Sequence, residues 1–292
     1  MTDIRQGPNR FGDDLTPRER FSRTMHYQHV DYVSHLEFGY WDELKEDWMR
    51  QGHLPERLRG TDGRISDRAV EEFFGVEQFE SFGAVIGAWP LRQRHEIERT
   101  ANTVTYRDGL GVLRQDKASG TETIPHFLEF PIRDRATWEA FRDEFLDAHH
   151  PARQLSPEQL AQGERQSRST PNPVSLGFGS FIGWIRDWIG FENLAYLSVD
   201  APDLVEEMVA HLSEMLLTLL PPVLVRGRFD AAAGWEDICY NSGPILNPRF
   251  FAQRIMPHMR PVMRLLRQHG IDVIWTDCDG NILKLIPLWL DV

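Results

Sequence analysis

Two adjacent carboxylates, Glu236 and Asp237, are the first candidates for catalytic residues in this chain. They follow an apolar segment, residues 229–233, whose length and composition predict a buried strand. Carboxylates that stand close together push each other's pKa values apart, so the pair is a candidate catalytic acid and base. Tyr240, shortly after them, is a candidate for substrate binding. The alternative interpretation is a solvated loop in which one acid caps a turn.

A second acidic segment follows the next predicted strand, residues 271–276. Asp277 and Asp279 are the other two candidate catalytic acids, and together with Cys278 they are candidate metal ligands. The segment contains a fragment of a calcium-loop pattern, but the required glutamate spacing is absent and a strand precedes it, which excludes an EF-hand. The alternative is a turn that caps the next helix. Because neighbouring parallel strands end at one edge of a sheet, we expect both acidic segments to line one pocket.

A glycine-rich loop at residues 177–183 lies between a predicted strand and a predicted helix. It resembles a loosened dinucleotide fingerprint, but no acidic residue ends a second strand about 20 positions later, so a nucleotide is disfavoured. A tight turn whose helix N-terminus holds an anionic substrate group is favoured instead. Arg186, just beyond the loop, is a candidate for substrate binding.

The end of the first predicted strand, residues 32–38, carries three further candidates for substrate binding: His35, Glu37 and Tyr40. A single histidine in such a place is more often structural than functional. The 11 histidines of the chain show no spacing typical of a zinc motif.

Composition narrows the classes of partner. The chain has 292 residues and a formal charge of −12, which disfavours nucleic acid and anionic membranes and leaves a small molecule as the expected ligand. The longest apolar run, residues 212–225, contains two prolines and is too short to span a bilayer. No secretory signal is recognisable, so a cytoplasmic protein with free thiols is expected. None of the three lysines follows a predicted strand, which disfavours Schiff-base chemistry.

The elements that must position these residues differ between the two halves of the chain. In the first half, capping signals predict a helix that begins after Thr16, further helices at residues 42–50 and 67–74, and a hairpin formed by residues 103–107 and 112–115. In the second half, strands are predicted at residues 173–178, 229–235 and 271–276. They alternate with helices predicted at residues 185–197 and 203–220, a helix that Asn247 and Pro248 open, and a helix that begins at Asn281. This alternation predicts an α/β fold with a parallel sheet.

Several segments together resemble the uroporphyrinogen decarboxylase superfamily, which includes the decarboxylase itself and corrinoid-dependent methyltransferases. The segments that carry this resemblance are residues 15–21, 29–33 with 38–41, 130–132 with Trp138, 186–192, 235–237 with 243–248, and 279–281 with 285–287. They extend over nearly the whole chain, and each one alone is moderately specific.

The resemblance implies a TIM-type (β/α)8 barrel formed by a single domain, residues 1–292. Residues 1–150 are expected to add N-terminal helices and the hairpin insertion, packed beside or over the pocket. Fewer strands are visible than the eight that a closed barrel requires, so the barrel is expected to be incomplete at the C-terminus. An unpaired apolar edge strand favours association, so we expect the chain either to be marginally stable alone or to form a homo-oligomer.

For function, the resemblance implies a methyltransferase-like enzyme that acts on a methylated small molecule or with a corrinoid protein as partner. The methyltransferase branch uses a His-x-Cys-Gly segment to bind zinc; aligned on Gly280, this chain has Asp277 and Asp279 at those two positions. The alternatives are a cofactor-free decarboxylase (a lyase) of a carboxylated substrate such as a tetrapyrrole, and a non-catalytic truncated barrel. The arginine-rich signature that holds uroporphyrinogen is absent near residues 38–48, which disfavours that compound itself.

Overall fold

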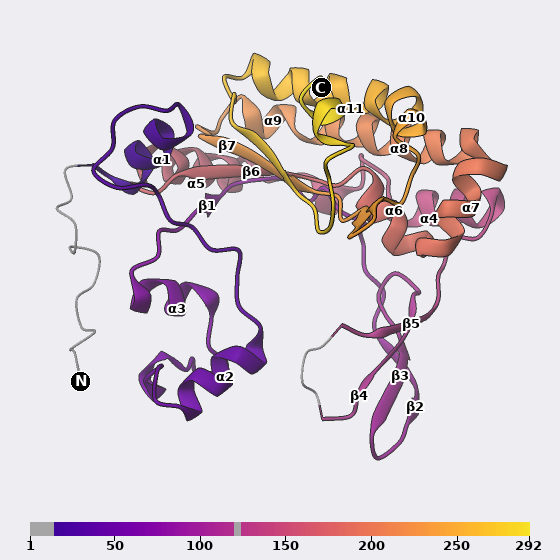
Figure 1. The fold of residues 1–292 in the computed structure, drawn as a ribbon, viewed down its shortest axis with the longest axis horizontal. Helices are drawn as coiled ribbons and strands as arrows, with labels where there is room; N and C mark the ends of the chain where they lie inside the picture. The colour runs from indigo at the N-terminus through magenta and orange to yellow at the C-terminus, as the bar shows by residue number, and fades with distance from the viewer. Residues whose placement is uncertain (1–14, 120–123) are drawn as a thin grey trace.

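A parallel sheet forms the centre of the molecule in the computed structural model, which describes residues 15–119 and 124–292. Its strands are β1 (Glu80–Ser81), β6 (Val174–Gly179), β7 (Ala231–Trp235) and β10 (Ile274–Asp277). They pair in the order β1-β6-β7-β10, all parallel, so the spatial order follows the chain order (Figure 1). The three strands predicted in the second half are confirmed. The sheet formed by the described residues is open, with β1 and β10 at its edges.

The strand predicted at residues 32–38 is wrong in extent. Within the described residues this segment makes one isolated parallel bridge, between Leu36 and Glu77. Val33 and Phe38 are exposed by 66% and 84%, so no apolar face holds the segment against a neighbour along its length. Leu36 itself packs with Phe21 on the face of the sheet opposite the main helix layer.

The helices described from residue 135 onward form a layer over one face of the sheet (Figure 1). They are α4 (Arg135–Phe145), α5 (Pro157–Ser169), α6 (Ile182–Ile189), α7 (Phe191–Asp200), α8 (Pro202–Leu219), α9 (Pro221–Leu224), α10 (Pro248–Phe250), α11 (Met256–Gln268) and α12 (Ile286–Trp289). Leu176 and Ala232 point from the sheet into the same core as Leu212 of α8 and Val262 of α11. Burial of this apolar face is the main favourable contribution to folding.

Two helix predictions are corrected by the backbone. The helix expected at residues 185–197 is two helices, because Gly190 separates α6 from α7 with φ +85°. The helix expected from Asn281 begins only at Ile286. After Asn247, a π-helical turn (Phe251–Ile255) joins α10 to α11, and Pro261 lies inside α11.

The most apolar helical segment, Pro202–Leu224, is the one described stretch with the length and mean hydropathy, 1.2, of a membrane span. In this structure 56% of its apolar 18-residue window is buried. Its buried residues include Val205, Met208, Leu212 and Leu216, whose spacing is that of one helix face against a core. Packing inside the protein therefore accounts for its apolar character.

Apart from β1, the described elements before residue 130 lie outside the parallel sheet. Helix α1 (Pro17–Met25) begins with a capping box between Thr16 and Glu19, as its sequence predicts. Helices α2 (Asp42–Arg50) and α3 (Asp67–Phe74), with a 3₁₀ turn (Glu56–Leu58) between them, have the predicted bounds. A 3₁₀ turn at Pro151–Arg153 precedes α5.

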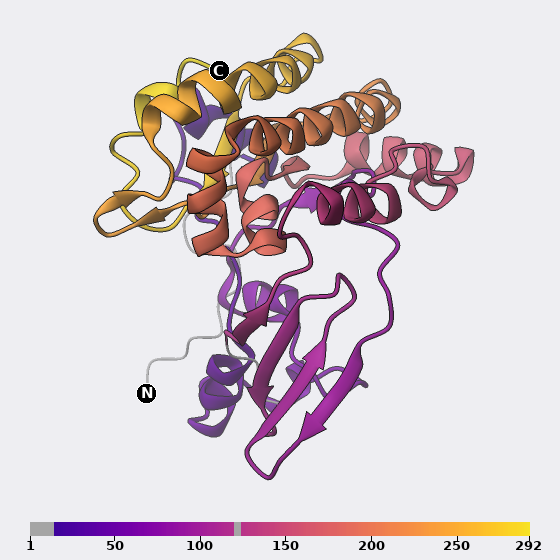
Figure 2. The same cartoon turned by 90° about the vertical axis from the view of Figure 1, so that its right-hand side faces the viewer.

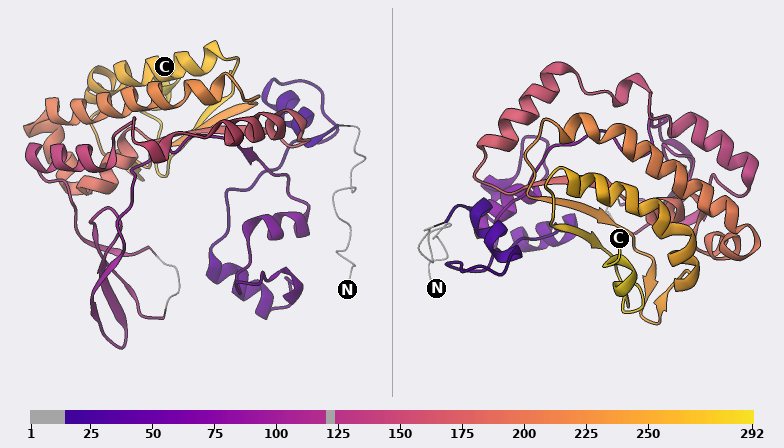
Figure 3. Two further views of the ribbon diagram at one scale, coloured as in Figure 1. Left: turned by 180° about the vertical axis from the view of Figure 1, so that it is seen from behind. Right: turned by 90° about the horizontal axis from the view of Figure 1, so that it is seen from above.

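The predicted hairpin is the centre of a four-stranded antiparallel sheet. Its strands, in spatial order, are β2 (His95–Arg99), β3 (Thr103–Arg107), β4 (Leu113–Lys117) and β5 (His126–Glu129). This sheet and the α2–α3 unit project as two separate extensions from the same side of the core (Figures 1 and 3). Figure 2 shows the antiparallel sheet face on. A small hairpin, β8 (Cys239–Tyr240) with β9 (Gly243–Pro244), follows β7.

Replacing Gly190 with alanine tests the break between α6 and α7. The new Cβ would lie 2.4 Å from the Phe130 ring at a φ that favours glycine. We expect Gly190→Ala to lower the free energy of unfolding by about 2–4 kcal/mol, measured by urea denaturation. Gly177→Ala is the matched control, because nothing lies within 4 Å of its Cβ. Equal losses in the two variants would contradict this account of the break.

Candidate functional site

The carboxylate of Glu236 is buried at the N-terminus of α6. Its side chain accepts hydrogen bonds from the backbone N–H groups of Phe181 (3.0 Å), Ile182 (2.8 Å) and Gly183 (3.0 Å). The hydroxyl of Ser180 donates a fourth, at 2.9 Å. The first N–H groups of a helix lack partners within the helix and carry partial positive charge, so a carboxylate is stabilised there. Glu236 therefore binds the end of β7 to the start of α6.

This geometry corrects two predictions. Glu236 was expected to line a pocket with the other acids, but it is 1% exposed and all its hydrogen bonds are to the loop before α6. The same helix N-terminus was expected to hold an anionic substrate group, and the chain's own carboxylate occupies that place. Burial raises the pKa of Glu236, and the N–H donors oppose that rise. The contacts of Glu236 are those of a residue that positions the start of α6 against the end of β7.

The other three predicted acids gather where β7 and β10 end. The backbone N–H of Asp279 donates to Oδ1 of Asp237 at 3.2 Å, and Asp237 adopts a left-handed conformation with φ +44°. Burial raises the pKa of Asp277, and the carboxylates of Asp237 and Asp279 raise it further. Asp237 and Asp279 line a cavity of about 370 Å³ with Arg186 and with Tyr240 of β8. The expected meeting of the two acidic segments in one pocket thus holds for Asp237 and Asp279, whereas Asp277, the last residue of β10, lies outside the linings of both cavities.

Helix α6 presents Arg186 and Asp187 to this edge. The Arg186 guanidinium donates to the backbone carbonyl of Asp237 and, at 2.9 Å, to Oδ1 of Asp187. Burial raises the pKa of Asp187, and Asp237 adds to that rise, while the cations Arg186 and Arg114 oppose it. Asp187 was not among the predicted site residues. Its place beside Arg186, just after the glycine-rich loop, is the sequence signal that identifies it.

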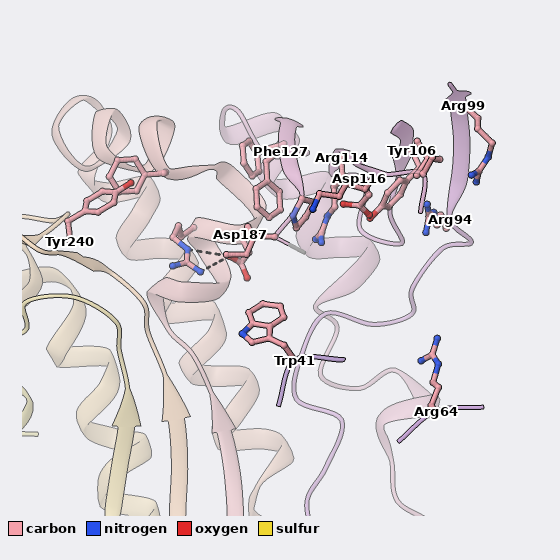
Figure 4. A pocket seen from close by; sticks show the side chains of 18 residues that line it. Trp41, Arg64, Arg94, Arg99, Tyr106, Arg114, Asp116, Phe127, Asp187 and Tyr240 are labelled. Carbon is pink, nitrogen blue, oxygen red and sulfur yellow. Dashed lines mark hydrogen bonds and ion pairs between the residues drawn. The ribbon is translucent and has the colours of Figure 1, made fainter. Parts of the chain in front are cut away.

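A second, much larger cavity of about 1160 Å³ continues from the same edge (Figure 4). Arg186, Phe191 and Tyr240 line both cavities, so the two are contiguous. In Figure 4 the labelled side chains extend from Tyr240, past Asp187 and Trp41, to Arg94 and Arg99 of the antiparallel sheet. The hairpin lies beside this larger cavity, because Val104, Tyr106, Arg114 and Asp116 belong to its lining.

The lining of the large cavity is cationic and aromatic although the whole chain is acidic. Among the residues that the structure describes, two acids line it, Asp116 and Asp187. The cations in its lining are Arg64, Arg94, Arg99, Arg114, Lys117 and Arg186, and the aromatic residues are Trp41, Tyr106, Phe127, Phe130, Phe191 and Tyr240. Arg186 alone among these cations was singled out from the sequence. The others come from separate segments that only the tertiary fold brings together.

The candidates from the first predicted strand lie outside the linings of both cavities. The side chains of His35 and Glu37 are exposed, and the His35 ring lies 6.3 Å from that of Tyr32. Tyr40 packs against Trp48 at a ring distance of 5.7 Å, in the small core of the α2–α3 unit. Its neighbour Trp41 is the residue of this segment that reaches the large cavity.

The predicted metal ligands do not form a coordination site. Among the residues that the structure describes, no group of three or more His, Cys, Asp or Glu side chains is placed to hold a metal ion. The Cys278 thiol instead donates to the backbone carbonyl of Asp279 at 3.5 Å, and burial raises the pKa of Cys278. A zinc ligand needs the deprotonated thiolate, which this environment disfavours. The arrangement of Asp277, Cys278 and Asp279 therefore does not fit zinc.

Comparison with known proteins supports the fold. No family model and no curated protein matches this chain. Among solved structures, the chain is similar to a methyltransferase from Methanosarcina mazei, with a TM-score of 0.52 and 12% sequence identity. The likeness covers 95% of this chain and 74% of that one. At this identity it concerns the architecture alone, a parallel sheet covered by helices.

Replacing Glu236 with glutamine tests whether its carboxylate holds the end of β7 to the start of α6. The amide NH2 would face backbone N–H donors, so we expect Glu236→Gln to lower the free energy of unfolding by about 1–3 kcal/mol in urea denaturation. Asp279→Asn is the matched control, since Asp279 is exposed and its change should stay within about 0.5 kcal/mol. A Glu236→Gln variant as stable as the control would show that the buried carboxylate does not hold the two elements together.

Proposed function

We propose that this chain is a methyltransferase-like enzyme of the uroporphyrinogen decarboxylase superfamily, acting on a methylated small molecule or with a corrinoid protein. The sequence segments that resemble the superfamily and the fold of the methyltransferase from Methanosarcina mazei support this proposal. The observation that carries it is the Arg186–Asp187 pair at the strand ends, which opens onto a cavity of about 1160 Å³. Active sites of α/β barrels lie at this end of the strands.

In this proposal Asp187 supplies a proton. Removal of a methyl group from nitrogen or oxygen leaves an electron pair on that heteroatom, and a proton must neutralise it as the bond breaks. A carboxylic acid whose pKa is raised by burial is suited to donate that proton. Arg186 fixes the orientation of the Asp187 carboxyl, and the acceptor takes the methyl group. No step is assigned to zinc, because the residues present do not fit it.

A cofactor-free decarboxylase is the second candidate. The observation that favours it is the cationic lining, because arginine and lysine bind carboxylates well. Here the C–C bond to the carboxylate breaks, carbon dioxide leaves, and Asp187 protonates the carbon that retains the electron pair. The same acid serves both reactions, so product analysis must separate them.

We also propose that the chain is one barrel-type domain with the first 150 residues as additions. Arg18 of α1 is ion-paired with Asp230, directly before β7, at 2.9 Å. Trp41 and Arg64 contribute to the same cavity as Arg186. If so, limited proteolysis should not release residues 1–150 as an independently stable part.

Asp187→Asn tests the proton donor. We expect methyl transfer to cob(I)alamin from a panel of methylated amines and methoxy compounds, followed by absorbance, to fall about 10²- to 10⁴-fold in this variant. With the protonated acid as the active form, the wild-type rate should fall as pH rises through the raised pKa of Asp187, and the variant should lose that dependence.

The matched control is Asp143→Asn. Asp143 also pairs with the arginine that precedes it, Arg142, but lies outside the cavity, so this variant should keep the wild-type rate and pH profile. Absence of transfer from every donor would contradict the methyltransferase proposal. Release of carbon dioxide from a polycarboxylate, lost in Asp187→Asn, would favour the decarboxylase instead.

A further inference from the structure

We propose that Cys239 and Cys278 form a reversible disulfide bond with glutathione disulfide as the oxidant, and that this bond fixes one wall of the cavity of about 370 Å³ at the strand ends. The bond would regulate the site on which the proposed function rests. Its formation is measured without turnover, so the failure of this inference and the failure of the proposed function are distinguishable.

The two segments that carry the cysteines run side by side beyond the ends of β7 and β10. The backbone N–H of Glu236 donates to the carbonyl of Asp277 at 2.9 Å. A Cβ added at Gly280 would lie 2.4 Å from the backbone oxygen of Cys239. Cys278 lies between these two contacts along its own segment. The backbone therefore holds Cys278 next to the segment that contains Cys239.

The two thiols lie close enough to influence each other. Burial raises the pKa of Cys239 to about 12, and the neighbouring Cys278 adds to that rise. Burial also raises the pKa of Cys278, while the backbone N–H of Ile238 and the Cys239 thiol oppose that rise. A donor lowers the pKa of a thiol in this way only from hydrogen-bonding distance. The sulfur of Cys278 therefore lies against the backbone just before Cys239, where its side chain faces the second thiol.

The exposure of the two thiols sets the order of the reaction. Cys239 is 8% exposed, whereas Cys278 is only partly buried. The Cys278 thiolate attacks one sulfur of glutathione disulfide, whose S–S bond breaks and releases one glutathione. The Cys239 thiolate then attacks the Cys278 sulfur of this mixed disulfide and releases the second glutathione. Two electrons pass from the protein thiols, which lose their protons, to the oxidant, which leaves as two molecules of glutathione.

The bond would act on residues that line the smaller cavity. Cys239 itself, its neighbour Tyr240, and Asp279 with Gly280 all belong to that lining. With the thiols free, the two segments are joined at this cavity by the hydrogen bond from the N–H of Asp279 to Oδ1 of Asp237, at 3.2 Å. A covalent bond beside this contact would stop the segments from separating. The supply of oxidant would therefore set the mobility of the wall that carries these two aspartates.

Incubation of the full chain with glutathione disulfide tests this inference. The chain has two cysteines, so an intramolecular disulfide has to join this pair. We expect peptide mapping by mass spectrometry to show residues 239 and 278 in one linked pair of peptides, and dithiothreitol to restore both thiols. Amide hydrogen exchange of residues 277–281 should slow about tenfold or more in the oxidised form. The midpoint of thermal unfolding should rise by about 4–10 °C.

The single variants Cys239→Ser and Cys278→Ser are the matched controls, because each keeps one thiol and loses the pair. The oxidant should change neither their amide exchange at residues 277–281 nor their thermal midpoint. The remaining thiol of Cys239→Ser is the more exposed one, so this variant should take up glutathione faster than Cys278→Ser.

Phenylarsine oxide tests the closeness of the two thiols without an oxidant, because its arsenic bridges two neighbouring thiols with loss of one water molecule. We expect the wild-type chain to retain one equivalent through gel filtration and to release it to 2,3-dimercaptopropanol. Neither single variant should retain the arsenical, since each has one thiol.

Three results would overturn the inference: a reaction that stops at the mixed disulfide with glutathione, a bond between two chains instead of within one, or equal retention of the arsenical by the wild type and the variants. A chain that forms the intramolecular bond but transfers no methyl group would retain this inference and lose the proposed function. A chain that transfers methyl groups but forms no such bond would do the opposite.

Discussion

The carboxylate of Glu236 at the N-terminus of α6 is the interaction on which the candidate site depends. A buried carboxylate is costly unless its hydrogen-bonding capacity is used, and here three N–H groups and one hydroxyl use it. Gly183 is part of the same contact, because a Cβ there would lie 2.7 Å from the backbone oxygen of Glu236. The end of β7 is therefore held against α6, and Arg186 and Asp187, one turn further along that helix, are carried to the acidic edge.

The site is formed by two parts of different charge. The strand ends contribute Asp237 and Asp279, and the antiparallel sheet opposite contributes most of the cations. Proton transfer needs a carboxyl of raised pKa, and recognition of anionic groups needs fixed positive charge. Asp187 on α6 lies where the two parts meet: Arg186 and Arg114 lower its pKa, and burial outweighs them and raises it.

The sequence predicts those features of the site that depend on patterns among neighbouring residues. The strands before Glu236 and Asp277, the capping box at Thr16 and the β3–β4 hairpin all have strong local signals, and the structure has each of them. Strand periodicity could not show which way Glu236 points, because Asp237 turns the chain with a positive φ. The cations on β2 and β4 were missed for another reason: a charged residue on a short strand looks like an ordinary solvated one until the tertiary fold sets it opposite Arg186.

The most direct test of this account is amide hydrogen exchange at Phe181, Ile182 and Gly183. The first N–H groups of a helix normally exchange quickly because they have no partner within the helix. If Glu236 binds them as described, all three should exchange only through global unfolding, as slowly as the amides of the buried strand β7. Fast exchange at these positions, with β7 still protected, would show that the carboxylate does not hold α6 and that Arg186 and Asp187 are not fixed at the acidic edge.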